Sequence, residues 1–185
     1  YALPVYYLIA PAYLLGNGNP AWPAVWLVLL NILGIYVIFR IGRDFFSEKA
    51  GIIAAFLIAF SHRLVQDHRW LSNPTPLPLT SALSVYLLLK IIRNQAKYYH
   101  YLLLGLFLGI SLQFEAASAI FFLPAVGLIF VLFYRQIFSQ FWNLLHLALT
   151  FTLTLLPQIY FNFRHDNILF QAFYRFLVSE KSFQI

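Results

Sequence analysis

The sequence predicts an all-α fold, a polytopic membrane bundle of about six transmembrane helices plus an interfacial helix. Of its 185 residues, 62% are hydrophobic and 10% are charged, whereas soluble domains are about 45–50% apolar and about 25% charged. A globule of this size exposes much of its surface and cannot hide so many apolar side chains. Lipid must therefore be the solvent, and the Tyr and Trp residues near the ends of apolar runs suit membrane interfaces.

The charge and the residue types exclude several function classes. A net charge of +6 would suggest a nucleic-acid partner in a soluble protein, but here the charges sit between apolar runs, so membrane topology explains them better. There is no cysteine, which excludes disulfide and thiolate chemistry. Methionine is also absent, and the chain starts inside an apolar run. We therefore expect residues 1–185 to be part of a single transmembrane domain of a longer protein.

Apolar runs give the expected elements in order. The run at 2–15 is only about four turns long, too short for ~30 Å of hydrocarbon, and this predicts an interfacial or re-entrant helix. A turn follows at 16–20, rich in Gly and Asn. The predicted spans are 21–39, 50–64, 75–89, 99–112, 116–133 and 144–160. Small residues around Gly51, and the Gly105-x-x-x-Gly109 step, favour close helix packing.

Basic residues concentrate in alternate loops. These loops carry Arg40, Arg43, Lys49, Lys90, Arg93, Lys97 and Arg135. Short loops rich in Lys and Arg face the cytoplasm. We therefore expect the loop at 61–78, the carboxylate of Glu115 and the polar cluster at 162–167 to share the outer face.

The densest group of polar residues lies at 61–78. Its guanidinium and imidazole groups could hold a phosphate, because Arg offers a fork of donors to phosphate oxygens. If the segment is helical, Arg63 and Asp67 stand four residues apart and can pair. His68, Arg69 and Asn73 follow directly. The same residues would also suit a solvated loop whose arginines reach lipid headgroups.

Glu115 is the acidic residue of a three-residue connection between two apolar spans. An ionisable group near the lipid boundary is costly unless it has a partner or reaches water, so it is a functional candidate. Its expected partners are Arg63, Arg69 or Arg164. A simple turn carboxylate in water is the alternative interpretation.

Arg164, His165 and Asp166 come directly after the last predicted span. They could bind an anion or orient a substrate hydroxyl, or they could form the polar cap of a helix emerging into water. His146 lies inside that span, where a hydrogen bond to a neighbouring helix is favoured over a metal-ligand role. No metal-ligand spacing, Gly-rich phosphate loop or nucleophilic triad is present in the sequence.

The order of these parts carries a family resemblance. A segment with a turn at 6–20 precedes a span ending in Arg40-Ile-Gly-Arg-Asp-Phe-Phe46, and Ala54-Ala-Phe-Leu-Ile-Ala-Phe-Ser-His62 follows. Arg69-Trp-Leu-Ser-Asn-Pro74 then opens the next span, and Leu102-Leu-Leu-Gly-Leu-Phe-Leu-Gly-Ile-Ser-Leu-Gln113 comes later. This order resembles the multi-spanning GT-C glycosyltransferases, specifically the dolichyl-phosphate-mannose protein mannosyltransferase and aminoarabinose transferase superfamily.

The resemblance implies transfer of a sugar from a polyprenyl-phosphate carrier to a protein, lipid or glycan acceptor. The reaction would take place on the extracytoplasmic face of a bacterial-type plasma membrane, with no nucleic-acid partner. The family's carboxylate, which acts as base or metal partner, would precede Tyr1. This leaves Glu115 and Asp67 as the local catalytic candidates and a divalent metal ion as an open cofactor question. The implied substrate-binding residues are Arg63, His68, Arg69, Asn73, Arg164 and His165.

One position departs from the family pattern. Many members have an Asp before the proline that opens the span after the outer loop, and this chain has Asn73 there. An amide can hydrogen-bond a sugar hydroxyl but cannot act as a base.

Two other function classes stay open. A transporter or flippase subunit would carry charged groups in the middle of its spans, and broken helices. A non-catalytic membrane scaffold is the third interpretation.

Overall fold

The computed structural model describes residues 3–67, 72, 74–138, 140–168, 170–171 and 174. Every regular element within these residues is an α-helix, which confirms the predicted all-α class. The helices are α1 (Leu3–Leu15), α2 (Ala21–Phe45), α3 (Glu48–Ala59), α4 (His62–Asp67), α5 (Leu77–Ile92), α6 (Tyr98–Phe114), α7 (Ala116–Leu132), α8 (Tyr134–Phe138) and α9 (Phe141–Arg164).

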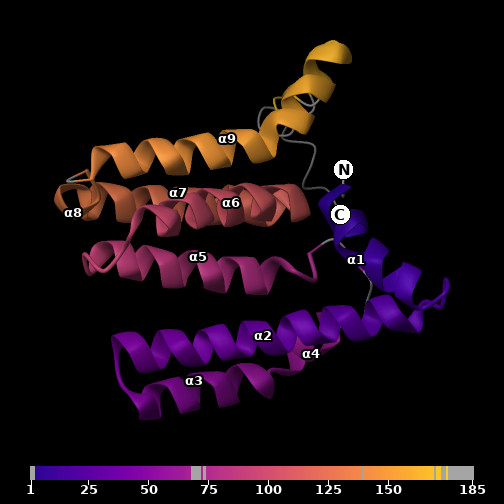
Figure 1. Cartoon of the computed structure of the whole chain (residues 1–185), viewed down its shortest axis with the longest axis horizontal. Coiled ribbons are helices and arrows are strands. Elements are labelled where there is room, and N and C mark those ends of the chain that lie inside the picture. Colours follow the sequence, from indigo (N-terminus) through magenta and orange to yellow (C-terminus); the bar gives the residue numbers. More distant parts are fainter. Residues whose placement is uncertain are drawn as a thin grey trace.

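The long helices lie side by side along one axis (Figure 1). Helices α2, α5 and α7 run from one end of this bundle to the other, and α3, α6 and α9 return. The short helix α1 packs across α2 and α6 at the end where α5 and α7 begin. Successive connections therefore alternate between the two ends, as the predicted topology requires.

Helix length separates the predicted spans into two groups. Helices α2 and α9, with 25 and 24 residues, are long and apolar enough to cross a membrane. Helices α5, α6 and α7 have 16, 17 and 17 residues, close to the lower limit of roughly 17 residues for a span. Helix α3 has 12 residues. Length and composition thus support two of the predicted spans directly.

Helix α6 lies at the centre of the bundle, with packing partners α5, α7 and α9. The largest buried cluster joins α5 to α6, with additions from α7 and α8: Leu87, Leu88, Ile91, Tyr101, Leu104, Leu108, Val126 and Ile137. A second cluster fixes α1 on α2 and α6: Val5, Ile9, Leu27 and Phe114. A third joins α2 to α5: Val37, Leu79 and Ala82.

Glycines set the closest helix contacts. A Cβ atom on Gly105 or Gly109 would overlap the hydroxyl of Thr150 or Thr154, respectively, on α9. The Thr150 hydroxyl donates to the carbonyl of Leu102 at 3.0 Å. The predicted close packing at this Gly-x-x-x-Gly step is confirmed, with α9 as its partner.

Three predicted spans have wrong boundaries. The last span, predicted at 144–160, is part of α9, which runs from Phe141 to Arg164. The span at 21–39 continues through the predicted loop to Phe45, because Arg40 and Asp44 pair one turn apart at 2.8 Å on a helix that keeps going. The single span predicted at 50–64 is instead two helices, since α3 ends at Ala59 and α4 begins at His62. Pro78 lies in the first turn of α5, where its missing N–H costs least.

Candidate functional site

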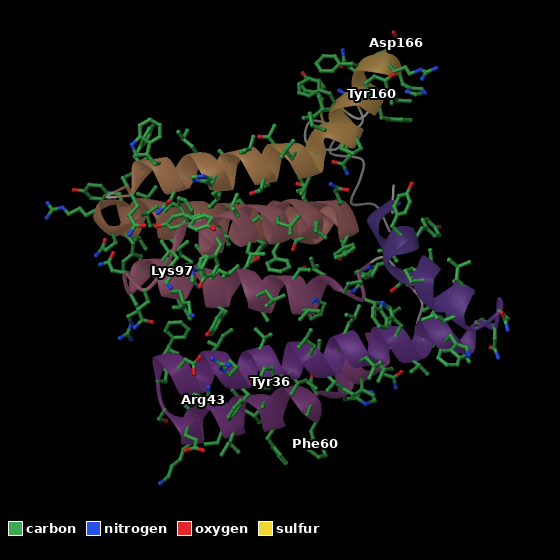
Figure 2. The ribbon with its side chains drawn as sticks, in the orientation of Figure 1. Tyr36, Arg43, Phe60, Lys97, Tyr160 and Asp166 are labelled. Atoms are coloured by element: carbon green, nitrogen blue, oxygen red, sulfur yellow. The ribbon has the colours of Figure 1, made fainter. Side chains whose placement is uncertain are left out.

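Polar groups predicted to share one face come from three elements. Helix α4 follows the end of α3, Glu115 follows the end of α6, and Arg164 ends α9. All three helix ends lie at the same end of the bundle (Figure 1). Figure 2 shows Tyr160 and Asp166 at this end, and Arg43 and Lys97 at the opposite one.

Within the described residues, the predicted polar loop contains helix α4. It holds Arg63 and Asp67 four residues apart, within one short helix of six residues. Their side chains lie outside the described atoms, as do His68, Arg69 and Asn73 entirely. The loop closes on α5 through Ser72 and Thr75, whose hydroxyl oxygens are 3.0 Å apart. Thr75 is buried, so this end of the loop is fixed where α5 begins.

Glu115 alone separates α6 from α7. Its backbone is extended, with φ −155° and ψ 104°, and it caps both helices. Its amide donates to the carbonyl of Ser111 at 3.2 Å, and the residue is half-buried. The predicted tight connection between two spans is therefore present, and it holds a carboxylate at the rim of the bundle.

A buried hydroxyl pair lies one turn below Glu115. The Ser111 hydroxyl donates to Thr80 Oγ1 at 2.7 Å, and Thr80 in turn donates to the carbonyl of Leu77 at 3.1 Å. Both side chains are buried. The pair ties the last turns of α6 to the first turns of α5, so it fixes the position of Glu115 relative to the end of the polar loop.

The C-terminal part of α9 bends away from the bundle (Figure 1). Pro157 lies inside this helix, and proline bends a helix because it removes one helical hydrogen bond and its ring clashes with the preceding turn. His165 Nδ1 lies 2.8 Å from the carbonyl of Phe161, and the two rings stack at 4.0 Å. The Asn162 amide donates to Asn167 Oδ1 at 3.0 Å. These bonds close the helix end, while Arg164 and His165 are exposed.

The three elements share an end of the bundle without forming one compact cluster. Among the described helices, α4 packs on α3 alone, whereas α9 packs on α6 and α8. Glu115 lies between them in the order of the helices across the bundle (Figure 1). A substrate that reached all three would have to lie across the end of the bundle.

Sequence reasoning missed an ionic network at the opposite end. Tyr86 Oη donates to Asp44 Oδ2 at 3.0 Å, and Arg40 donates to the same oxygen at 2.8 Å. Arg93 donates to the carbonyl of Phe45 at 3.4 Å, and the Lys90 ammonium lies 5.2 Å from the Tyr86 ring centre. The network joins α2 to α5. The four-residue spacing of Arg40 and Asp44 indicates this ion pair in the sequence, because residues four apart on a helix can pair.

The prediction for His146 is wrong. Its Nδ1 lies 2.9 Å from the carbonyl of Trp142, one turn back on its own helix. Its contact with the neighbouring helix α6 is a ring contact, 6.2 Å between the centres of the His146 and Tyr98 rings. Over the described ranges, no three His, Asp or Glu side chains gather as metal ligands would.

Long apolar helices with polar residues gathered at their ends are typical of helical membrane proteins. The chain belongs to the dolichyl-phosphate-mannose-protein mannosyltransferase family, whose model matches residues 2–161. This is a membrane family of GT-C glycosyltransferases, and the resemblance seen in the sequence is confirmed. Comparison with curated proteins and with solved structures found no match.

Proposed function

We propose that this chain forms part of a membrane glycosyltransferase that transfers a sugar from a polyprenyl-phosphate carrier to an acceptor on the extracytoplasmic face. The acceptor would be a protein, a lipid or a glycan. The observation that supports this most is the family match over residues 2–161. The shared end of α4, α6 and α9 supports it further.

A lipid-linked donor needs a particular kind of site. Its phosphate must sit at the membrane interface while its isoprenoid tail stays in hydrocarbon. In the proposed topology α2, α5, α6, α7 and α9 are spans, and α3 together with the residues that lead into α4 makes the remaining crossing. The ends that carry the site face outward. The basic residues of the other end, Arg43 and Lys97 among them (Figure 2), would face the cytoplasm.

The arginines would act on the departing phosphate. When the bond between the sugar C1 and the phosphate oxygen breaks, negative charge builds up on that oxygen. Guanidinium groups of Arg63, Arg69 and Arg164 would neutralise this charge, and such electrostatic stabilisation is the largest single contribution in many enzymes. His68, Asn73 and His165 would hold the phosphate or the sugar hydroxyls.

A base must take the proton of the acceptor hydroxyl as its oxygen bonds to C1. The local candidates are Glu115 and Asp67. Glu115 sits half-buried at the junction of two helices, and a base held on regular elements keeps a well-defined distance from the hydroxyl. The products are the glycosylated acceptor and the polyprenyl phosphate.

The test is activity of the full-length protein with polyprenyl-phosphate sugars as donors. We expect Glu115→Ala to lower turnover about a hundredfold, the lower end of what a positioned general base contributes. Arg69→Ala should also lower turnover about a hundredfold, the lower end of what one electrostatic donor contributes. Arg135→Ala is the matched control, because Arg135 is exposed at the other end of the bundle. Unchanged turnover in both site variants would remove these residues from the site.

A transporter or flippase subunit is the second candidate. It would need charged groups in the middle of its spans. In the described helices, Lys, Arg, Asp and Glu residues lie within about two turns of a helix end. This distribution favours chemistry at the interface over passage through the bundle.

A further inference from the structure

Gln113 lies in the last turn of α6, two residues before Glu115. Its side-chain amide donates to the backbone carbonyl of Thr154 on α9. The bond is partly buried, and a polar group in such a place needs a partner, because an unpaired one loses its hydration without compensation. The turn of α6 that leads to the proposed base is therefore attached to the neighbouring helix.

The carbonyl that Gln113 contacts belongs to Thr154, which precedes Pro157 by three residues. Proline gives the helix no backbone N–H, and its ring clashes with the turn before it. Within a membrane, a neighbouring helix can bond the backbone groups that such a break frees. A side chain that inserts into the backbone hydrogen-bond ladder is also a cause of a bend in its own right. Gln113 thus reaches α9 at the turn that leads toward the part bent away from the bundle (Figure 1).

The direction of this bent part decides where the end of α9 lies. Past Pro157, the side chains of Tyr160 and Arg164 are exposed. The part of α9 that begins at Thr154 and ends at Arg164 is roughly 15 Å long at 1.5 Å per residue. A change of ~20° in its direction, the size of a marked kink, would move its tip by about 5 Å. The place of the Arg164 guanidinium relative to Glu115 therefore depends on the direction that α9 takes.

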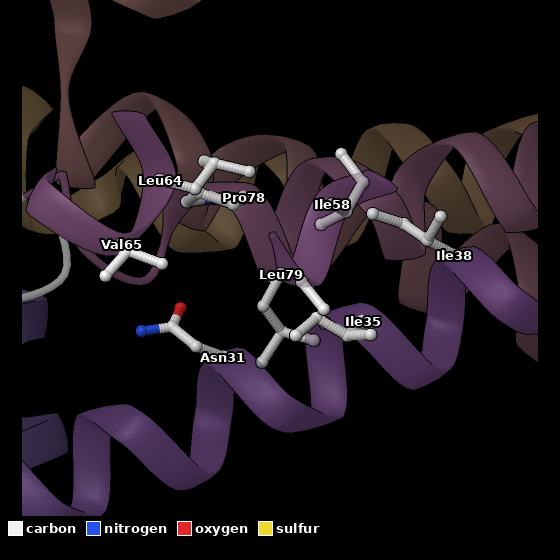
Figure 3. A pocket seen from close by; sticks show the side chains of 10 residues that line it. Asn31, Ile35, Ile38, Ile58, Leu64, Val65, Pro78 and Leu79 are labelled. Carbon is white, nitrogen blue, oxygen red and sulfur yellow. The ribbon is translucent and has the colours of Figure 1, made fainter. Parts of the chain in front are cut away.

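The side of the bundle end that carries α4 is built differently. An apolar cavity of about 230 Å³ lies between α2, α3, α4 and α5, with Ile58, Val65 and Leu79 among the residues that line it (Figure 3). Among the described helices, α4 packs on α3 alone. This side leaves room beside α4, whereas the α9 side has a directed bond to the turn before Glu115. Gln113 is therefore the residue to test for placing one part of the site relative to another.

We propose that Gln113 is a positioning residue for sugar transfer: its bond to the Thr154 carbonyl sets the direction in which α9 leaves the bundle and so holds Arg164 at a fixed distance from Glu115. The donor phosphate then meets the Arg164 guanidinium while the acceptor hydroxyl meets Glu115. Gln113 itself touches neither substrate. The effect on turnover rests on the proposed function, whereas the placement of α9 can be measured without any activity.

The placement is tested on the full-length protein with spin labels on Glu115→Cys and Arg164→Cys. Gln113→Leu keeps a side chain of similar size without a donor, and we expect it to shift the distance between the labels by about 5 Å. Thr150→Val is the matched control. It removes the hydroxyl that donates to the Leu102 carbonyl at 3.0 Å, one turn further from Pro157, and should leave the distance unchanged. An unchanged distance in Gln113→Leu, or an equal shift in Thr150→Val, would overturn the proposal.

Turnover separates positioning from a general loosening of the bundle. With a polyprenyl-phosphate sugar as donor, Gln113→Leu should lower kcat/KM about tenfold, because misplacement of a site group by a mutation far from the chemistry can cost up to a hundredfold. Thr150→Val should leave kcat/KM unchanged. In the Arg164→Ala background, Gln113→Leu should lower kcat/KM no further, because the residue through which it acts is gone. An equal loss in both backgrounds would indicate a structural role and overturn the proposal. A wild type without transfer activity would contradict the proposed function, and the label distances would then decide the placement of α9.

Discussion

Replacement of Gly109 by alanine tests the contact on which the central packing of the bundle depends. The added Cβ would overlap the Thr154 hydroxyl, lie 2.9 Å from Thr154 Cβ and lie 3.3 Å from the carbonyl oxygen of Phe151. All three of these atoms belong to the backbone or to a β-branched side chain with few rotamers. Helix α6 must therefore move away from α9, since no side chain can swing aside.

The expected change in the free energy of unfolding of Gly109→Ala follows from two opposing effects. Alanine is a better helix former than glycine by about 0.8–1.0 kcal/mol, whereas overpacking of a tight contact costs typically about 1–3 kcal/mol. Gly109→Ala should thus lower the free energy of unfolding by up to ~2 kcal/mol, the difference between these two ranges. Gly127 of α7 is the matched control, because a Cβ there would meet nothing within 4 Å. Gly127→Ala should be neutral or stabilising.

The assay is unfolding of the purified full-length protein in mixed micelles as the fraction of denaturing detergent rises. Gly109→Ala should unfold earlier than the wild type, and Gly127→Ala should not. Thr154→Ala in the Gly109→Ala background removes the closest overlapping atom and should restore part of the loss. If the two alanine variants shift the midpoint equally, the close approach of α6 and α9 is wrong.

Two further predictions concern α2 and α9. Tyr86→Phe keeps the ring but removes the hydroxyl that donates to Asp44 at 3.0 Å, so it should cost about 0.5–1.5 kcal/mol in the same assay. Tyr160→Phe is the control, because Tyr160 is 67% exposed, and it should leave the free energy of unfolding unchanged. If Tyr86→Phe and Tyr160→Phe change this free energy equally, the link between α2 and α5 is contradicted. Pro157→Ala restores a backbone donor within α9 and should straighten it. Spin labels at positions 142 and 160 should then approach the ~27 Å separation of a straight helix, and an unchanged distance would show that proline does not cause the bend.

The helices themselves could be predicted because apolar runs separated by polar loops determine where a chain can cross lipid. The ends of the helices were harder to predict. Arg40 and Asp44 look like loop residues, yet their spacing lets them pair on a helix that runs past the apolar stretch. The break at Ser61 has no proline or glycine to signal it. It depends on tertiary packing, which a pattern of residue types does not contain.

The candidate site, like the helices, could be predicted only in part. Alternation of the helices predicts that the end of α4, the residue Glu115 and the end of α9 belong to one end of the bundle, and the helix directions agree with this (Figure 1). The order of the helices across the bundle could not be predicted, and it separates α4 from α9. The Gly105-x-x-x-Gly109 step predicted a close contact but not that α9 makes it.

The account depends on Glu115 and Arg164 facing the same side of the membrane, and chemical labelling measures this directly. The chain has no cysteine, so single cysteines can be introduced into it without a background of native thiols from these residues. In intact cells, a membrane-impermeant maleimide should label Glu115→Cys and Arg164→Cys. It should label Arg43→Cys and Arg135→Cys only after the membrane is opened. Labelling of Glu115→Cys and Arg164→Cys from opposite sides would contradict the proposed site.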